Sequence, residues 1–202
     1  MSRTMRFPRA PAVLAAAALT LLFTGCSSEQ PWKLKDISGL LPDLKYELTR
    51  AADGERITEK AYQGKVRVLF FGFTNCPDIC PTTLAEFSRA LDSMESGADD
   101  VRILFVSVDP ERDSANKLSR YVDAFGEQFV GLRASEPVLR ELVKRYRVTF
   151  GYDEPDPNGW YEVSHSSAAF IFDREGNIRL LAQQKDTIEA ITADLQRLTR
   201  EE

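Results

Sequence analysis

The chain has 202 residues, of which 43% are hydrophobic and 28% charged, and its formal net charge is −5. This length is sufficient for one globular domain with a full hydrophobic core. The net negative charge argues against nucleic acid as a partner, because nucleic acid binding calls for a basic surface.

The N-terminal segment has the order of an export signal. Arg3, Arg6 and Arg9 precede a short apolar run that extends from Ala12 to Phe23. A helix needs about 20 apolar residues to cross a bilayer, so a cleaved signal explains this run better than a permanent membrane span.

The residues after the apolar run resemble a bacterial lipobox, with Thr24 and Gly25 directly before Cys26. We therefore expect residues 1–25 to be a lipoprotein signal peptide and Cys26 to carry the lipid. Ordinary signal cleavage near Ala15 to Ala18, with Cys26 left as a spare thiol, is the alternative. Lipidation would hold the protein on the cell membrane, facing the periplasm or another extracytoplasmic space.

A tether is expected over the polar residues 26–39, followed by one domain over residues 40–202. Cleavage before Cys26 removes three of the 26 basic residues and none of the 31 acidic ones, which leaves a formal charge of −8. A body of this charge is not attracted to anionic lipid, so the anchor alone must hold the protein at the membrane.

Hydrophobic periodicity predicts strands alternating with helices through the rest of the chain. The predicted strands cover residues 44–49, 56–58, 66–73, 101–108, 129–132, 168–172 and 178–181. The predicted helices cover residues 82–94, 114–125, 136–146 and 187–198. This order indicates an α/β protein with a thioredoxin-like fold, an added N-terminal β-hairpin and an insertion before the final hairpin.

The segment Cys76-Pro77-Asp78-Ile79-Cys80-Pro81 follows the first buried strand. Pro81 suits the first position of a helix, so we expect Cys80 to cap that helix and the helix dipole to favour its thiolate. Residues four apart in a regular helix have Cβ atoms roughly 5–6 Å apart, whereas a relaxed disulfide needs about 3.8 Å. Because the prolines interrupt this regularity, the two sulfurs can form a redox-active disulfide or spread around an ion. A permanent structural disulfide is the less favoured alternative, since so small a loop adds little stability.

Copper is the expected metal for the two thiolates. They are too few for zinc, which normally takes four ligands, but they suit copper(I), which prefers soft sulfur. His165 is the only histidine in the chain and stands just before the predicted strand 168–172. In a thioredoxin fold this position lies against the cysteine loop, so we expect Cys76, Cys80 and His165 to bind the metal.

Three segments are similar to the Sco/SenC family of copper chaperones for cytochrome c oxidase. They are FGFTNCPDICPTTLAEF at residues 71–87, VSVDPERD at residues 106–113 and VSHSSAAFIFDREG at residues 163–176. The resemblance implies copper bound by Cys76, Cys80 and His165, and delivery to, or thiol reduction of, the dinuclear copper site of the oxidase. The expected partners are the copper-site subunit of the oxidase, thioredoxin-like reductants and other copper carriers.

The main alternative is a thiol–disulfide oxidoreductase or redox sensor in which Cys76 and Cys80 cycle and His165 is incidental. Thioredoxins carry CxxC and place a cis-proline before the third buried strand, where this chain has Ser166 and Ser167. A peroxiredoxin-like enzyme would need a threonine three residues before the attacking cysteine, and that spacing fails here. Copper carriage rather than catalysis is therefore the expected role, with enzymatic activity left open.

Two further features have two interpretations each. Asp78, Asp109 and Asp113 either modulate the site or dock a partner, or they are solvated loop carboxylates, which is the favoured interpretation. Residues 152–162 interleave acidic residues with Tyr152, Trp160 and Tyr161. This segment is either a partner-docking loop that also positions His165, or a solvated acidic loop with its aromatic residues folded onto the body.

Overall fold

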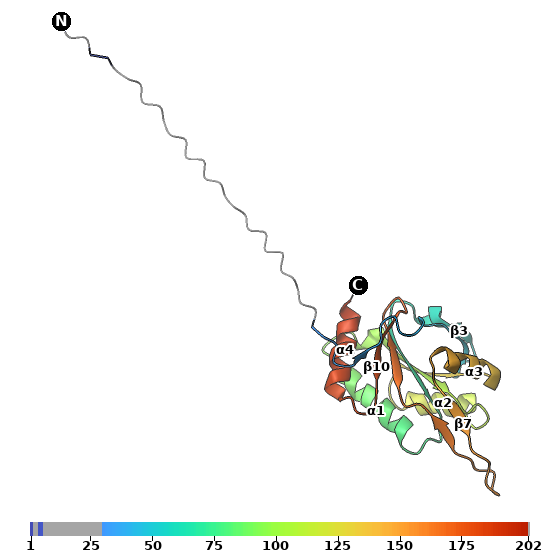
Figure 1. Ribbon diagram of the computed structural model, residues 1–202. Coiled ribbons are helices and arrows are strands. Elements are labelled where there is room, and N and C mark those ends of the chain that lie inside the picture. Colours follow the sequence, from blue (N-terminus) through green and yellow to red (C-terminus); the bar gives the residue numbers. More distant parts are fainter. Residues whose placement is uncertain (2–3, 6–29, 202) are drawn as a thin grey trace. The chain divides into compact units, whose positions relative to one another are not determined.

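A central sheet of eight strands carries the fold in the computed structural model (Figure 1). The structure describes residues 1, 4–5 and 30–201, so the predicted lipobox and Cys26 lie outside the described residues. The helices and strands belong to a compact unit that spans Trp32–Glu202. No helix in the described part of the chain is both long and apolar enough to cross a membrane.

The main sheet has the strand order β1-β10-β9-β4-β5-β6-β2-β3. Its strands are β1 (Lys35–Asp36), β2 (Glu47–Arg50), β3 (Arg56–Thr58), β4 (Val66–Gly72), β5 (Val101–Ser107), β6 (Phe129–Arg133), β9 (Ala169–Phe172) and β10 (Ile178–Ala182). The central strand β4 pairs in parallel with β5 and antiparallel with β9. The thioredoxin-like α/β fold and the leading hairpin, formed by β2 and β3, are as predicted.

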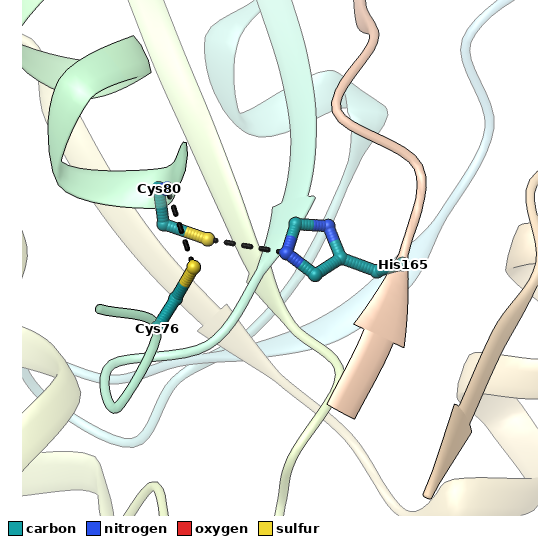
Figure 2. A group of neighbouring side chains, drawn as sticks. All are labelled: Cys76, Cys80 and His165. Carbon is teal, nitrogen blue, oxygen red and sulfur yellow. Dashed lines mark hydrogen bonds between the residues drawn. The ribbon is translucent and has the colours of Figure 1, made fainter. Parts of the chain in front are cut away.

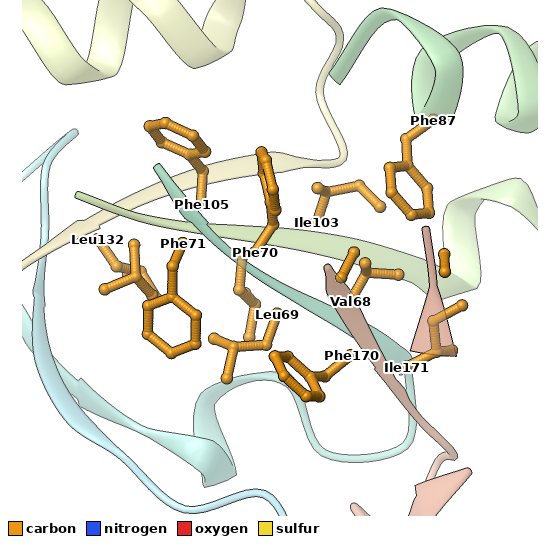
Figure 3. Close-up of a cluster of buried hydrophobic side chains, with 14 of the residues drawn as sticks. Val68, Leu69, Phe70, Phe71, Phe87, Ile103, Phe105, Leu132, Phe170 and Ile171 are labelled. Carbon is orange, nitrogen blue, oxygen red and sulfur yellow. The ribbon is translucent and has the colours of Figure 1, made fainter. Parts of the chain in front are cut away.

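Four helices of the described part of the chain cover the sheet. They are α1 (Ile79–Asp92), α2 (Ala115–Asp123), α3 (Glu136–Arg145) and α4 (Ile188–Arg200), and short 3-10 turns cover Glu59–Tyr62 and Ala98–Asp100. All seven residues of β4 are buried, which explains its unbroken apolar sequence. Figure 3 shows Phe70 and Phe105 on the face of the sheet toward Phe87 of α1, and Leu69 and Phe71 on the opposite face.

The segment predicted as a tether is partly folded, which corrects the predicted domain boundary. Leu34 and Ile37 are buried, and Lys35 of β1 pairs with Leu181 of β10. The Asp194 carboxylate accepts hydrogen bonds from the backbone amides of Lys33 and Leu34. The domain therefore begins near Trp32 rather than at residue 40, because its apolar side chains find a place against α4 and the sheet edge.

The insertion before the final hairpin forms a small sheet of its own. Strands β7 (Phe150–Tyr152) and β8 (Val163–His165) pair antiparallel in a two-stranded sheet, separate from the main one. The periodicity of the sequence did not predict these two short strands. Their register sets Phe150 opposite His165, at the end of the insertion nearest to the cysteine loop.

Candidate metal centre

The cysteine loop connects the end of β4 to the start of α1. The Cys76 amide donates to the Phe73 carbonyl over 3.2 Å, and the Cys80 amide lies 3.4 Å from the Cys76 Sγ. The helix begins at Ile79 with Asp78 as its cap, so the prediction that Cys80 caps the helix was wrong. Cys80 lies in the first helical turn instead and is fully buried, whereas Cys76 is partly exposed.

The imidazole of His165 faces the two sulfurs. Its Nε2 lies 3.4 Å from the Cys80 Sγ, and its Nδ1 lies 2.9 Å from the Ser166 carbonyl oxygen. A carbonyl only accepts hydrogen bonds, so Nδ1 carries the proton and Nε2 presents its lone pair to the sulfurs. Burial lowers the pKa of His165, which keeps the ring neutral. A neutral imidazole with one nitrogen fixed by a carbonyl is the form that binds metals.

The structure brings the three predicted ligands together. The ligand atoms of Cys76, Cys80 and His165 all lie within 4.8 Å of one another. Figure 2 shows the two sulfurs and the imidazole edge converging from the cysteine loop, the first turn of α1 and the end of β8. The two sulfurs are soft donors and imidazole is a common copper ligand, so this ligand set fits copper(I).

The expected effect of the helix dipole on Cys80 was wrong. Burial raises the pKa of the Cys80 thiol, and the neighbouring Cys76 adds to this effect. The physical reason is that Cys80 is enclosed by the apolar core. The free energy needed to remove a thiolate from water exceeds the favourable interaction of that thiolate with the helix N-terminus. A cation held between the sulfurs would supply the missing charge, so the site favours the metal-bound thiolate over the free one.

A cavity of about 350 Å³ opens beside the cysteine loop. Its walls include Cys76, His165, Arg112 and the aromatic residues Trp160 and Tyr161. Two of the three candidate ligands therefore line a space through which an ion or a partner side chain can reach them.

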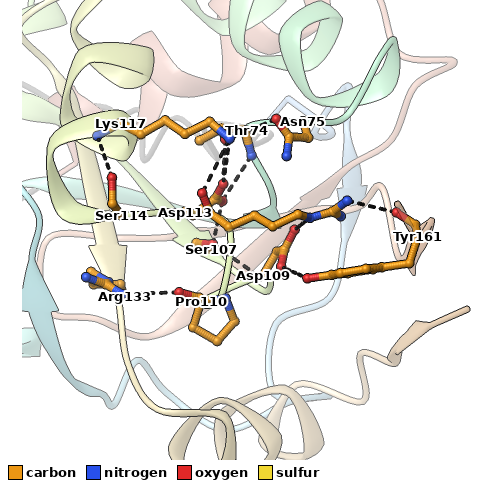
Figure 4. A network of polar contacts seen from close by, with 11 residues as sticks. Thr74, Asn75, Ser107, Asp109, Pro110, Asp113, Ser114, Lys117, Arg133 and Tyr161 are labelled. Carbon is orange, nitrogen blue, oxygen red and sulfur yellow. Dashed lines mark hydrogen bonds and ion pairs between the residues drawn. The ribbon is translucent and has the colours of Figure 1, made fainter. Parts of the chain in front are cut away.

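Two of the three aspartates are buried, against the favoured interpretation. Asp78 is exposed, as expected, but Asp109 and Asp113 are both 0% exposed. Asp113 accepts hydrogen bonds from the Thr74 amide over 3.0 Å and from the Ser107 hydroxyl over 2.6 Å (Figure 4). These bonds hold the start of the cysteine loop against the end of β5. The position of Asp113 just beyond a buried strand was the only sign of this role in the sequence.

The aromatic residues of the insertion fold onto the body, as one of the two interpretations predicted. The Tyr152 hydroxyl donates to the Val108 carbonyl over 2.7 Å, and the Tyr161 hydroxyl donates to Asp109 over 2.8 Å. Burial raises the pKa of Tyr161 to about 12, so it remains a donor at neutral pH. Trp160 is 55% exposed and lies at the rim of the cavity.

Comparison with known proteins gives one consistent result. The family model described as SCO1/SenC matches residues 43–200. The mitochondrial protein SCO1 homolog 1 of Arabidopsis thaliana is 36% identical over 141 residues, which are 69% of this chain and 42% of that protein. This chain thus spans less than half the length of that relative.

Two solved structures are similar over most of the folded unit. Bradyrhizobium japonicum ScoI with copper bound is 35% identical with a TM-score of 0.69, and the match covers 77% of this chain and 98% of that one. Apo Sco1 of Thermus thermophilus is 33% identical with a TM-score of 0.73, and the match covers 85% of this chain and 99% of that one.

Proposed function

This chain belongs to the SCO1/SenC family, and we propose that it is a copper metallochaperone that acts in assembly of the dinuclear copper site of cytochrome c oxidase. Copper is its cargo, bound by Cys76, Cys80 and His165. The observation that carries this proposal is the convergence of two sulfurs and one imidazole nitrogen within 4.8 Å. The copper-bound structure of the similar Bradyrhizobium japonicum protein supports the choice of metal.

Copper binding and disulfide formation compete in this mechanism because they use the same two sulfurs. Binding of copper(I) displaces the thiol protons of Cys76 and Cys80, and the neutral His165 supplies the third lone pair. Oxidation instead removes two electrons and two protons from the thiols and joins the sulfurs. The reduced protein should therefore take up about one equivalent of copper(I), and the oxidised protein should bind none.

The decisive experiment replaces His165 with alanine. This change removes one of three ligands and leaves both thiols, so copper affinity of the reduced protein should fall and cells under copper limitation should lose oxidase activity. Ser164→Ala, which changes an exposed neighbour on β8, is the matched control. Full oxidase activity at matched protein level, together with undiminished copper binding by His165→Ala, would refute the proposal.

A second candidate function is thiol–disulfide exchange or redox sensing, favoured by the unequal exposure of the cysteines. The partly exposed Cys76 thiolate would attack a substrate disulfide and form a mixed disulfide. The buried Cys80 would then attack the Cys76 sulfur, releasing the reduced substrate and closing an internal disulfide. The His165→Ala variant separates the two functions, because an oxidoreductase would keep its activity without the imidazole.

We also propose that the protein is anchored to the cell membrane through a lipid on Cys26, with the copper site facing the periplasm or extracytoplasmic space. The proposal is supported by the export-signal order of residues 1–25 and the lipobox-like residues before Cys26. Mass spectrometry of the mature protein should find an acylated N-terminal Cys26. An unmodified N-terminus near Ala18, or a retained signal, would contradict it.

A further inference from the structure

The three candidate ligands come from two segments, each of which lies four residues from a central strand of the main sheet. Cys76 and Cys80 are joined directly to the main sheet through β4 and to α1. His165 ends a two-stranded sheet that has no strand pairing with the main one. An isolated two-stranded hairpin is marginally stable in water. The place of His165 relative to the sulfurs therefore depends on the short link to β9 and on the side-chain contacts that hold β7 and β8 onto the body.

Several of those contacts lie at the loop after β5, where the Tyr152 hydroxyl donates to the Val108 carbonyl and where Asp109, Arg112 and Tyr161 form a cluster. The Arg112 Nε donates to the Asp109 carboxylate over 2.6 Å, and its Nη1 donates to the Tyr161 carbonyl over 2.9 Å. The guanidinium carbon lies 3.7 Å from the centre of the Tyr161 ring, and the Tyr161 hydroxyl donates back to Asp109. Each of these three residues thus contacts the other two.

This cluster is buried enough to matter energetically. The Asp109 carboxylate is 0% exposed and the Arg112 side chain 19% exposed, so neither the ion pair nor the hydrogen bonds are screened as they would be at the surface. Removing any one member would leave a buried charged group without one of its hydrogen-bond or ion-pair partners.

The cluster also leads to His165 by two routes. Along the chain, Tyr161 stands four residues before His165, and Val163 between them is buried. Through space, the Arg112 guanidinium lies 5.9 Å from the centre of the Phe73 ring. The Phe73 ring in turn meets the imidazole edge-on, with ring centres 5.6 Å apart.

We propose that Asp109, Arg112 and Tyr161 form a clamp that positions His165 against Cys76 and Cys80. They are positioning residues for copper binding and contact no metal themselves. This inference rests on the proposed function for its consequence, but the clamp itself exists in the metal-free protein. The loop after β5 then holds both halves of the site, with Asp113 on the cysteine side and Asp109 on the histidine side (Figure 4).

The first test measures amide hydrogen exchange in the reduced, metal-free, full mature protein. Tyr161→Phe deletes one hydrogen bond to a charged acceptor, and Arg112→Met deletes the guanidinium while keeping most of its bulk. Either change should raise exchange of amides in residues 150–165 about tenfold or more, and leave β4 and β5 protected. Tyr62→Phe is the matched control, since Tyr62 accepts a hydrogen bond from Arg50 far along the chain from the site. Unchanged exchange in residues 150–165, or an equal rise throughout the protein, would overturn the clamp.

The second test asks whether the clamp acts through His165. Copper(I) affinity is measured for wild type, Tyr161→Phe, His165→Ala and the double variant. We expect Tyr161→Phe to weaken copper binding about tenfold in the wild-type background and to have no effect when His165 is already absent. Equal losses in both backgrounds, or no loss in either, would refute the positioning role. If the wild type binds no copper(I), the proposed function fails, while the exchange experiment still decides whether the clamp exists.

Discussion

Replacing the buried Asp113 tests whether the loop after β5 holds the cysteine loop in place. In Asp113→Ala, the Thr74 amide and the Ser107 hydroxyl both lose their acceptor in the protein interior. An unsatisfied buried donor costs about 1–3 kcal/mol, so the two together should lower the free energy of unfolding by about 2–6 kcal/mol. This is a large part of the roughly 5–15 kcal/mol that is usual for a domain.

Asp113→Asn should cost much less. The bonds from the Thr74 amide and the Ser107 hydroxyl end on the same carboxylate oxygen, Oδ2, and an asparagine can place its amide oxygen there, while the Thr74 hydroxyl donates to Oδ1. The new NH₂ group would face the Thr74 hydroxyl, which can rotate and accept a hydrogen bond. We therefore expect a loss of about 1 kcal/mol for this variant, the net worth of one ordinary hydrogen bond.

Urea unfolding of the reduced, metal-free protein measures these differences. Asp78→Asn is the matched control, because Asp78 is exposed in the same loop and its only side-chain bond in the described structure is a 3.3 Å contact with Thr82. The order of stability should be wild type and Asp78→Asn, then Asp113→Asn, then Asp113→Ala. Equal stability of Asp113→Ala and Asp78→Asn would show that the buried carboxylate does not hold the loop.

Three further experiments probe the site and the folded N-terminal segment. A Cβ on Gly72 would lie 2.7 Å from the Cys80 Sγ and 2.6 Å from a Phe105 ring carbon. Gly72→Ala should therefore lower the free energy of unfolding in urea by about 1–3 kcal/mol and weaken copper binding. Wild-type values for both measurements would contradict the close packing of the Cys80 sulfur against β4. Burial raises the pKa of the Cys80 thiol above its unfolded value, so its contribution to stability is complete below about pH 8.5 and is lost as pH rises further, by at most about 1.4 kcal/mol per pH unit. Unfolding of the reduced, metal-free protein from pH 7 to 10 should show this fall, and an equal fall in Cys80→Ala would assign it elsewhere. Asp194→Ala removes the acceptor for the Leu34 amide, so limited proteolysis near residue 34 should accelerate; unchanged cleavage would mean that strand pairing alone holds this segment.

The neutral state of the metal-free site has a chemical consequence. Burial lowers the pKa of His165 and raises that of Cys80, so both side chains are uncharged at neutral pH before copper arrives. In this state the Cys80 thiol donates its hydrogen to the His165 Nε2 over 3.4 Å. Copper binding replaces that hydrogen bond with two bonds to the metal and releases the thiol proton, so copper uptake should weaken as pH falls.

The sequence by itself determined the elements whose causes are local. The apolar run of residues 66–73 predicted the central strand β4, and helical spacing of apolar residues predicted the four helices to within a few residues. The cysteine motif and the single histidine likewise predicted which side chains would meet, because a thioredoxin fold brings the end of its first buried strand beside the start of a later one.

Only the tertiary structure decided the burial and pairing of polar groups. Asp113 meets Thr74 from 39 positions away, and Arg112 meets Tyr161 from 49 positions away, so no local pattern separates these residues from solvated ones. The same holds for the residues just after Trp32. Their polar sequence predicted a tether, but the structure packs them against the sheet edge and α4. The ionisation of Cys80 followed from enclosure by the core rather than from its place on the helix, since desolvation depends on everything packed around a group and not on its neighbours in sequence.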